Sequence, residues 1–246
     1  MNNTKPDMFS KVIKSMIEDS GGSVDKIHLD KYMELMEECF MYNPRNFWLG
    51  VKIEKSPLDL MILQEVIFEK RPDTIIECGT GYGGSVYYMA TLMDLMNLDG
   101  KIITVDHHEY QTQAYPKKEF IKIGGKIVAV NLDLFQEPTH PRIEHVYSDC
   151  LNADMPELRE RESKTMVILD SDNSATYVYK ELEKFSRMVT IGQYIIVTNT
   201  IIPEKSNGPA GAVKKFLYKN KSFIADKSRE KFGISSNPGG YLLRIS

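Results

Sequence analysis

The residues best suited to bind a ligand lie in one glycine-rich segment, residues 77–85, which reads ECGTGYGGS. Glycine lets the backbone turn sharply and approach a ligand closely, because it carries no Cβ that would clash. A helix that begins near Gly84 would direct its free N–H groups at the same point. The segment therefore predicts a binding site for a nucleotide-like cofactor.

The spacing of these glycines narrows the choice of cofactor. A dinucleotide-binding turn reads G-x-G-x-x-G, whereas the segment from Gly79 reads G-T-G-Y-G-G and is preceded by an acid, Glu77. An acid in this position is typical of methyltransferases, which place it near the methionine ammonium of S-adenosylmethionine. The turn therefore favours S-adenosylmethionine over NAD.

Acidic and polar residues also end the strands predicted next along the chain. Asp106 ends the second strand, where a carboxylate can accept hydrogen bonds from both ribose hydroxyls. Residues 148–150 follow the third strand, where a short polar side chain can bind the adenine amine. Open α/β sheets bind their ligands at this edge. The residues that we expect to hold the cofactor are Glu77, Gly79, Thr80, Gly81, Gly83, Ser85, Asp106, His107, Ser148, Asp149, Cys150 and Asp170.

The hydrophobic pattern predicts the elements that position these residues. Ser56 is a good N-cap and Pro57 suits a first helical position, so we expect a helix from there to about Glu69. Short apolar strands are expected at 74–78, 101–106, 143–147, 165–169, 193–197, 222–225 and 240–245. Alternation of the first five with helices favours a parallel sheet covered on both faces, and the last two should pair antiparallel. The predicted fold class is α/β: a Rossmann-like class I methyltransferase fold, with a mostly parallel seven-stranded sheet and a C-terminal antiparallel hairpin.

The chain divides into two regions. Residues 1–47 have apolar side chains at helical spacing and are expected to form two helices. Neither helix could bury its apolar face alone, so we expect them to form an N-terminal helical cap on the main domain. Residues 48–246 form the methyltransferase domain. Within it, residues 107–140 are an insert that could serve as a substrate lid, an oligomer contact or an extra hairpin around residues 124–125.

Composition excludes several functional classes. The 246 residues carry a formal net charge of −3, which gives no general attraction to nucleic acid or to anionic membranes. The N-terminus lacks the apolar region of a signal peptide, and no apolar run is long enough to span a membrane. The 3 cysteines form neither a metal-ligand pair nor a disulfide framework. We expect a cytoplasmic protein whose partner is a small molecule.

Several stretches together carry a family resemblance. They are 48–59 (WLGVKIEKSPLD), 76–85 (IECGTGYGGS), 169–174 (LDSDNS), 208–217 (GPAGAVKKFL), 228–232 (SREKF) and 237–244 (NPGGYLLR). In these the chain resembles the cephalosporin hydroxylase-like family, which includes rhamnosyl and macrolide-sugar O-methyltransferases. The resemblance implies a class I fold, S-adenosylmethionine as cofactor, and methyl transfer to a hydroxyl of a sugar, glycan or small natural product. It also implies a homo-oligomer, since relatives commonly self-associate.

The chain departs from the family at two functional positions. Family members usually place a metal-binding Asp after the fourth strand and a Glu-Asp pair after the fifth; Asp170 matches the first, but Thr198 and Asn199 replace the pair. One carboxylate with two neutral oxygens binds a divalent cation such as Mg²⁺ far more weakly than three carboxylates. The family pattern DSDHS also becomes DSDNS, so that Asn173 replaces a His that could act as a general base. We therefore expect no dependence on a divalent metal, with Asp170 only a weak candidate ligand.

Four explanations of these departures stay open. The enzyme could methylate without metal, with Asp170 or Asp172 as the base and Asn173 facing the acceptor. It could use His107 or His108, it could act on an acceptor other than a hydroxyl, or it could be a cofactor-binding homologue that has lost catalysis. An NAD-linked oxidoreductase is disfavoured by the glycine spacing.

Overall fold

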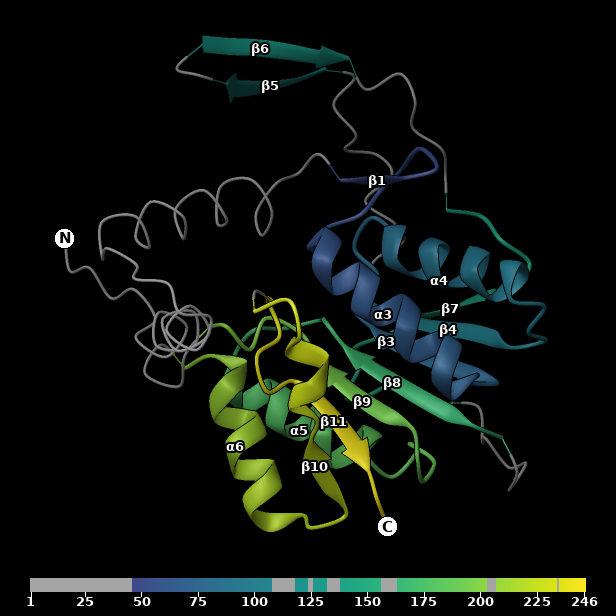
Figure 1. The fold of residues 1–246 in the computed structure, drawn as a ribbon, viewed down its shortest axis with the longest axis vertical. Helices are drawn as coiled ribbons and strands as arrows, with labels where there is room; N and C mark the ends of the chain where they lie inside the picture. The colour runs from purple at the N-terminus through teal and green to yellow at the C-terminus, as the bar shows by residue number, and fades with distance from the viewer. Residues whose placement is uncertain are drawn as a thin grey trace, which may run out of the picture.

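The computed structural model (Figure 1) describes residues 46–107, 118–123, 126–131, 138–155, 163–202, 207–233 and 235–246. The predicted N-terminal cap, residues 1–47, lies almost entirely outside these ranges, as does His108. The sheet and the helices that pack on it fall within them.

The central element is a seven-stranded sheet, as the sequence predicted. In chain order its strands are β3 (Thr74–Cys78), β4 (Lys101–Asp106), β7 (Ile143–Tyr147), β8 (Thr165–Leu169), β9 (Tyr194–Val197), β10 (Phe223–Ala225) and β11 (Tyr241–Arg244). Their order across the sheet is β10-β11-β9-β8-β3-β4-β7. The strands from β9 to β7 are parallel, whereas β11 pairs antiparallel with both β9 and β10. The parallel core and the antiparallel C-terminal hairpin are therefore confirmed.

Helices cover both faces of this sheet (Figure 1), which explains why its central strands are apolar throughout. Helices α3 (Pro57–Lys70) and α4 (Gly84–Leu95) pack on one face, and α5 (Ala175–Phe185) and α6 (Pro209–Lys219) pack on the other. Strands β3 and β8 are buried at every position. A short 3₁₀ helix, η4 (Lys227–Glu230), lies between β10 and β11.

The start of α3 follows the sequence prediction. The Ser56 side chain accepts a hydrogen bond from the N–H of Leu58 at 3.3 Å, and Pro57 occupies the first helical turn. The helix ends at Arg71, whose φ of 45° is left-handed. Lys55 directly precedes this N-cap residue.

A small hairpin of β1 (Phe47–Trp48) and β2 (Val51–Lys52) precedes α3 and lies against α4. Trp48 Nε1 donates a hydrogen bond to the Thr91 hydroxyl at 2.8 Å. The chain after β2 passes so near the start of α4 that a Cβ on Gly84 would lie 2.0 Å from the Lys52 carbonyl oxygen. Residues 53–55 are thereby held across the carboxyl ends of the strands.

The insert at 107–140 contains a second hairpin. Strands β5 (Lys118–Ile123) and β6 (Lys126–Asn131) pair antiparallel around residues 124–125 and form a sheet of their own (Figure 1). This confirms the extra hairpin among the three alternatives; a role as a lid or an oligomer contact stays a prediction. In the part of the chain that the structure describes, no helix has the length and apolar character needed to cross a membrane.

Candidate functional site

The glycine-rich turn links β3 to α4 and packs against the end of β8. Gly79 has a φ of +90°, and a Cβ there would lie 2.3 Å from the Asp170 carbonyl oxygen. Only glycine combines this backbone conformation with so close an approach. The turn and the Asp170 backbone therefore form one surface.

Asp106 lies directly beside this turn. Its Oδ2 accepts hydrogen bonds from the N–H groups of Thr80 at 2.8 Å and Gly81 at 3.2 Å. The Thr80 hydroxyl is 2.6 Å from the hydroxyl of Thr104, which anchors the turn to β4. The glycine turn therefore contacts the end of β4, as predicted.

Glu77 lies within β3 and is completely buried rather than exposed at the sheet edge. Its Oε2 accepts a hydrogen bond from the Ser85 hydroxyl at 2.8 Å, and its Oε1 lies 3.6 Å from Lys55 Nζ. Burial raises the pKa of Glu77 to about 7, although the positive charge of Lys55 lowers it in part. Oε1 has no hydrogen-bond partner among the described residues and is paired with the positive charge of Lys55.

The end of β7 meets the end of β4 through Asp149. Its Oδ1 accepts hydrogen bonds from Leu151 N at 2.8 Å and Asn152 N at 3.1 Å, and its Oδ2 lies 3.2 Å from His107 Nε2. Oδ2 also accepts a hydrogen bond from the Tyr177 hydroxyl at 3.0 Å. Burial raises the pKa of Asp149, but these hydrogen bonds outweigh it and hold the pKa below its usual range. Ser148 lies beside them and donates to the Asp149 carbonyl.

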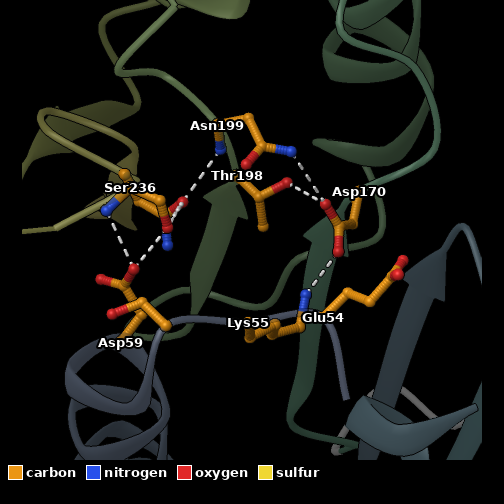
Figure 2. A pocket seen from close by; sticks show the side chains of 9 residues that line it. Glu54, Lys55, Asp59, Asp170, Thr198, Asn199 and Ser236 are labelled. Atoms are coloured by element: carbon orange, nitrogen blue, oxygen red, sulfur yellow. Dashed lines mark hydrogen bonds and ion pairs between the residues drawn. The ribbon is translucent and has the colours of Figure 1, made fainter. Parts of the chain in front are cut away.

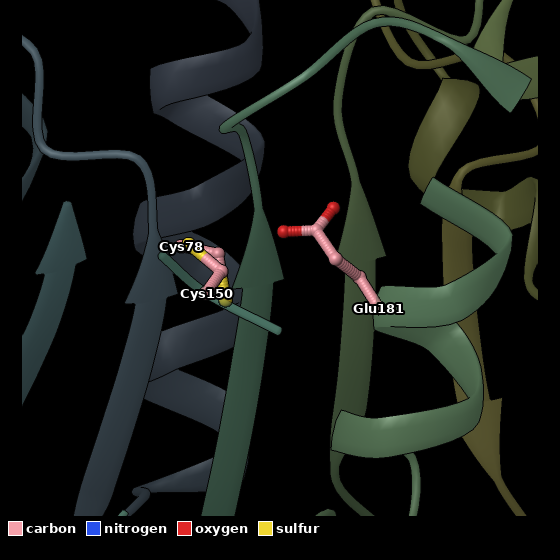
Figure 3. Close-up of side chains that lie close together, drawn as sticks. All are labelled: Cys78, Cys150 and Glu181. Atoms are coloured by element: carbon pink, nitrogen blue, oxygen red, sulfur yellow. The ribbon is translucent and has the colours of Figure 1, made fainter. Parts of the chain in front are cut away.

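Cys150 does not line the edge of the sheet with Ser148 and Asp149, because its side chain is buried in the core. Its Sγ, that of Cys78 and a carboxylate oxygen of Glu181 all lie within 4.8 Å of one another (Figure 3). Burial raises the pKa of the Cys78 thiol, and burial raises that of Glu181 to about 7, with a hydrogen bond from Ser171 opposing the rise. We interpret these three buried groups as core residues beneath the site.

Asp170 follows β8 and is the centre of a polar cluster (Figure 2). Its Oδ1 accepts hydrogen bonds from the Thr198 hydroxyl and, at 3.4 Å, from the Asn199 amide. Its Oδ2 accepts one from the Lys55 ammonium at 2.5 Å. The cluster borders a small pocket of about 30 Å³, lined by Glu54, Lys55, Ser56, Asp59, Asp170, Thr198, Asn199, Ser236 and Asn237.

Lys55 is the residue of this site that sequence reasoning missed. Its side chain is 11% exposed and lies between the carboxylates of Asp170 and Glu77. Burial lowers its pKa, but the two carboxylates more than offset this and raise the pKa above its ordinary value, so that Lys55 is an ammonium. Its place before the Ser56-Pro57 helix start, within a stretch that carries the family resemblance, is the signal that could have revealed it.

The other two predicted catalytic residues are exposed and lie near the start of α5. Asp172 Oδ1 accepts a hydrogen bond from Ser174 N at 2.5 Å, which makes it part of the turn that leads into the helix. Asn173 Oδ1 accepts one from the Asn199 amide at 3.0 Å. Asn173 therefore reaches the Asp170 cluster through Asn199, whereas Asp172 has a structural contact of its own.

A buried carboxylate, Asp59, orders the opposite wall of the pocket. It accepts hydrogen bonds from Ser235 Oγ at 2.6 Å and Ser236 N at 2.9 Å, and from the Ser236 hydroxyl. Asn237 Oδ1 in turn accepts from Asn199 N at 2.9 Å. These contacts fix the backbone of Asn199, whose φ of 55° is left-handed.

The residues around Asp170 do not fit a divalent cation. Mg²⁺ prefers several oxygen ligands, including carboxylates, but here Thr198 and Asn199 are neutral and both donate hydrogen bonds to Asp170. The remaining oxygen of Asp170 contacts the Lys55 ammonium, which would repel a second cation. Thr198 and Asn199, which stand in place of the usual acidic pair in the sequence, thus lie in the structure as hydrogen-bond donors to Asp170.

The sheet order, the glycine turn after β3 and the acids at the neighbouring strand ends define a class I methyltransferase fold. The family model "Rhamnosyl O-methyltransferase/CmcI" matches residues 40–245, and the chain belongs to this family. It is therefore an S-adenosylmethionine-dependent methyltransferase.

Individual relatives are similar over most of their length. Rhamnosyl O-methyltransferase of Mycobacterium tuberculosis (strain ATCC 25618 / H37Rv) is 28% identical over 206 residues, which cover 80% of this chain and 77% of the relative. The protein of the same name from Mycobacterium leprae (strain TN) is 27% identical over 214 residues, 83% of this chain and 85% of the relative.

Solved structures show the same fold. A structure described as "cmcI-N160 SAH" aligns with a TM-score of 0.60 at 19% identity and covers 89% of this chain and 92% of its own. A second, "cmcI-D160 Mg-SAM", aligns with a TM-score of 0.59 at 18% identity and covers 82% of this chain and 78% of its own. At such identities the likeness establishes the fold and not the details of the site.

Proposed function

We propose that this protein transfers the methyl group of S-adenosylmethionine to a hydroxyl of a sugar, glycan or small natural product, without a divalent cation. The observation that carries the proposal is the position of Asp170, whose backbone touches the glycine turn and whose carboxylate borders an open polar pocket. A cofactor in the turn and an acceptor in the pocket would meet at this residue. The names of the curated relatives support a sugar as the acceptor.

The cofactor would lie across the carboxyl ends of β3, β4 and β7. In this arrangement the methionine ammonium would lie on the side of Glu77, whose Oε1 is paired with Lys55, and Asp106 would accept hydrogen bonds from the ribose. Ser148 and Asp149, with His107 beside them, lie where the adenine would end. Gly79, Thr80, Gly81, Gly83 and Ser85 shape the turn between these groups.

The polar lining of the pocket suits a sugar. Glu54 and Asn199 offer charged and amide groups that can exchange hydrogen bonds with several hydroxyls of one ring. One such hydroxyl beside Asp170 would lie in line with the methyl group. The protein would contribute mainly by aligning the acceptor oxygen with the methyl carbon, because displacement at carbon needs a short and linear approach.

Asp170 is the group that we assign to proton removal. Its backbone packs against the turn and its side chain lines the pocket, whereas the carboxylate of Asp172 binds the backbone before α5. Asn173 cannot accept a proton and would orient the acceptor together with Asn199. Of the two remaining candidates, His108 lies outside the described residues, and His107, which is 59% exposed, lies beside Asp149 at another part of the sheet edge.

The proposal is tested by measuring S-adenosylhomocysteine release with S-adenosylmethionine and a panel of rhamnosides, other glycosides and phenols. Asp170→Asn is expected to lower kcat by about 10²–10⁴-fold, the usual contribution of a general base. Asp172→Asn, the matched control, is expected to lower it by less than about tenfold, because it keeps a hydrogen-bonding oxygen for Ser174. Equal losses in the two variants would contradict the assignment. Binding of S-adenosylhomocysteine by the unaltered protein without turnover on any acceptor would instead indicate a homologue without catalysis.

Homo-oligomer formation and a cytoplasmic location stay part of the proposal. The former is measured by light scattering on the purified protein during size-exclusion chromatography. A single mass that corresponds to the 28.2 kDa chain would contradict it.

A further inference from the structure

We propose that the Lys55 ammonium, in place of a divalent cation, supplies the positive charge beside the acceptor oxygen. This inference rests on the proposed function, because it concerns the oxygen that Asp170 and the pocket would receive. It concerns the point at which Thr198 and Asn199 stand in place of the usual acidic pair.

The first support is the position of the ammonium. Lys55 Nζ lies 2.5 Å from Asp170 Oδ2 (Figure 2). It also lies 3.6 Å from Glu77 Oε1, and so bridges the ends of β8 and β3. Lys55 also lines the open pocket. A hydroxyl bound next to the Asp170 carboxylate would therefore lie close to a fixed positive charge.

The second support is that the backbone of Lys55 is held on both sides. The Asn46 amide donates a hydrogen bond to the Lys55 carbonyl oxygen at 2.9 Å, and Ile53 N donates to the Asn46 carbonyl at 2.8 Å. The next residue, Ser56, caps α3. A long side chain is thus anchored at its base and by ion pairs at its tip, which reduces the reorganisation needed when charge develops nearby.

The third support is the balance of charge. A divalent cation is balanced by the three carboxylates of the usual family pattern, whereas one ammonium needs fewer. Here Asp170 and the buried Glu77 are the carboxylates within reach of Lys55, and Thr198 and Asn199 are neutral hydrogen-bond donors to Asp170. Neutral residues at 198 and 199 agree with a monovalent rather than a divalent charge at this point.

The chemical step balances without any further reactant. The acceptor oxygen forms a bond to the methyl carbon while the carbon–sulfur bond breaks, and its electron pair returns the sulfonium to a neutral thioether. The hydroxyl proton passes to a carboxylate oxygen of Asp170. Lys55 keeps its protons throughout and stabilises the negative charge that develops on the acceptor oxygen.

Lys55→Met tests this role, because it keeps most of the side-chain volume and removes the charge. We expect kcat to fall by about 10²–10³-fold, as for other fixed electrostatic groups, while the dissociation constant for S-adenosylhomocysteine changes by less than about threefold. Lys55→Arg should restore part of kcat, and Lys180→Met, at an exposed position on α5, should leave it unchanged. A tenfold or greater loss of S-adenosylhomocysteine affinity in Lys55→Met would overturn the inference, since Lys55 would then bind the methionine carboxylate. An unchanged kcat would also overturn it.

Titration with Mn²⁺ as a paramagnetic probe provides a second measurement that needs no altered Lys55. Electron paramagnetic resonance of the unaltered protein, with and without S-adenosylhomocysteine, should detect no Mn²⁺ site that depends on Asp170. Such a site, abolished in Asp170→Asn, would overturn the inference whether or not an acceptor is known. The double variant Thr198→Glu/Asn199→Asp restores the acidic pair and keeps Lys55, and the triple variant adds Lys55→Met. The triple variant should bind Mn²⁺ much more tightly than the double variant. Equal Mn²⁺ affinities in the two variants would count against Lys55 as the resident cation.

These results separate the inference from the proposed function. If the unaltered protein binds S-adenosylhomocysteine but methylates no acceptor, the proposed function is refuted, and the catalytic part of the inference falls with it. If it methylates an acceptor and also needs Mn²⁺ or Mg²⁺ at Asp170, the function stands and the inference alone is wrong.

Discussion

Replacing Gly79 by alanine tests whether the glycine turn and the Asp170 backbone form one surface. The new Cβ would lie 2.3 Å from the Asp170 carbonyl oxygen, 2.6 Å from its carbon and 2.8 Å from Ser171 Cα. All three are backbone atoms, so no flexible side chain can move to make room. The residue also has a φ of +90°, which alanine adopts at a cost.

The two costs can be estimated separately. An alanine held at positive φ costs about 1–2 kcal/mol, and forcing an extra carbon into a packed site costs about 1–3 kcal/mol. The free energy of unfolding should therefore fall by about 2–5 kcal/mol in Gly79→Ala, the sum of these two ranges. Gly81→Ala is the matched control: its φ is +51°, but a Cβ there meets nothing within 4 Å, so only the conformational cost of about 1–2 kcal/mol remains.

Urea unfolding of both variants, followed by circular dichroism, measures the difference directly, and calorimetric titration with S-adenosylhomocysteine follows the site. Gly79→Ala should also lose most of its affinity, because the Asp170 backbone has to move away from the turn. If Gly79→Ala is as stable as Gly81→Ala and binds as well, the close contact between the turn and β8 is absent and the reasoning about this surface is wrong.

Three further predictions concern the cofactor, the buried acids and the metal. Asp106→Ala should weaken S-adenosylhomocysteine binding by more than about tenfold in calorimetry, because charge-assisted hydrogen bonds are lost; an unchanged affinity would place the ribose elsewhere. Burial raises the pKa of Glu181 to about 7, so its contribution to stability is present below about pH 4.5 and is lost as the pH rises through about 7. The urea midpoint of unfolding should be measured at pH 5 and pH 8, about the two ends of this range. The change in midpoint between the two pH values should be smaller in Glu181→Gln than in the exposed control Glu183→Gln on the same helix. Equal changes in the two variants would refute a buried Glu181 that is neutral at low pH. Treatment with EDTA should leave methyl transfer intact, and loss of activity that Mg²⁺ restores would show that Asp170 and its neutral neighbours hold a metal.

The sheet and the turn could be predicted because their signals are local. Each central strand is a short apolar run, and the start of α3 is encoded by the adjacent residues Ser56 and Pro57. Parallel strands then bring their carboxyl ends to one edge, so Asp106 and Asp149 could be placed there without a structure. The antiparallel C-terminal pair followed from the short connection between its strands.

The details of the site depended on contacts between distant residues, which no local pattern encodes. Lys55 lies 115 positions before Asp170, and only the path of the chain across the strand ends brings them together. Cys150 and Glu77 share the sequence context of the polar strand ends, yet Cys150, in the turn after β7, is buried in the core, and Glu77, within β3, is buried completely. Asp172 is a reasonable base by type, but the backbone N–H of Ser174 already uses one of its oxygens.

The central claim is that the turn after β3, with the acids at the neighbouring strand ends, binds S-adenosylmethionine beside Asp170. A crystal structure of the protein with S-adenosylhomocysteine tests this most directly. The account predicts one nucleoside in the turn, with its ribose on Asp106, its amino group near Glu77 and its sulfur towards the pocket that Asp170 and Lys55 line. A turn that stays closed by its own side chains at saturating ligand, or a nucleoside bound elsewhere on the protein, would contradict it.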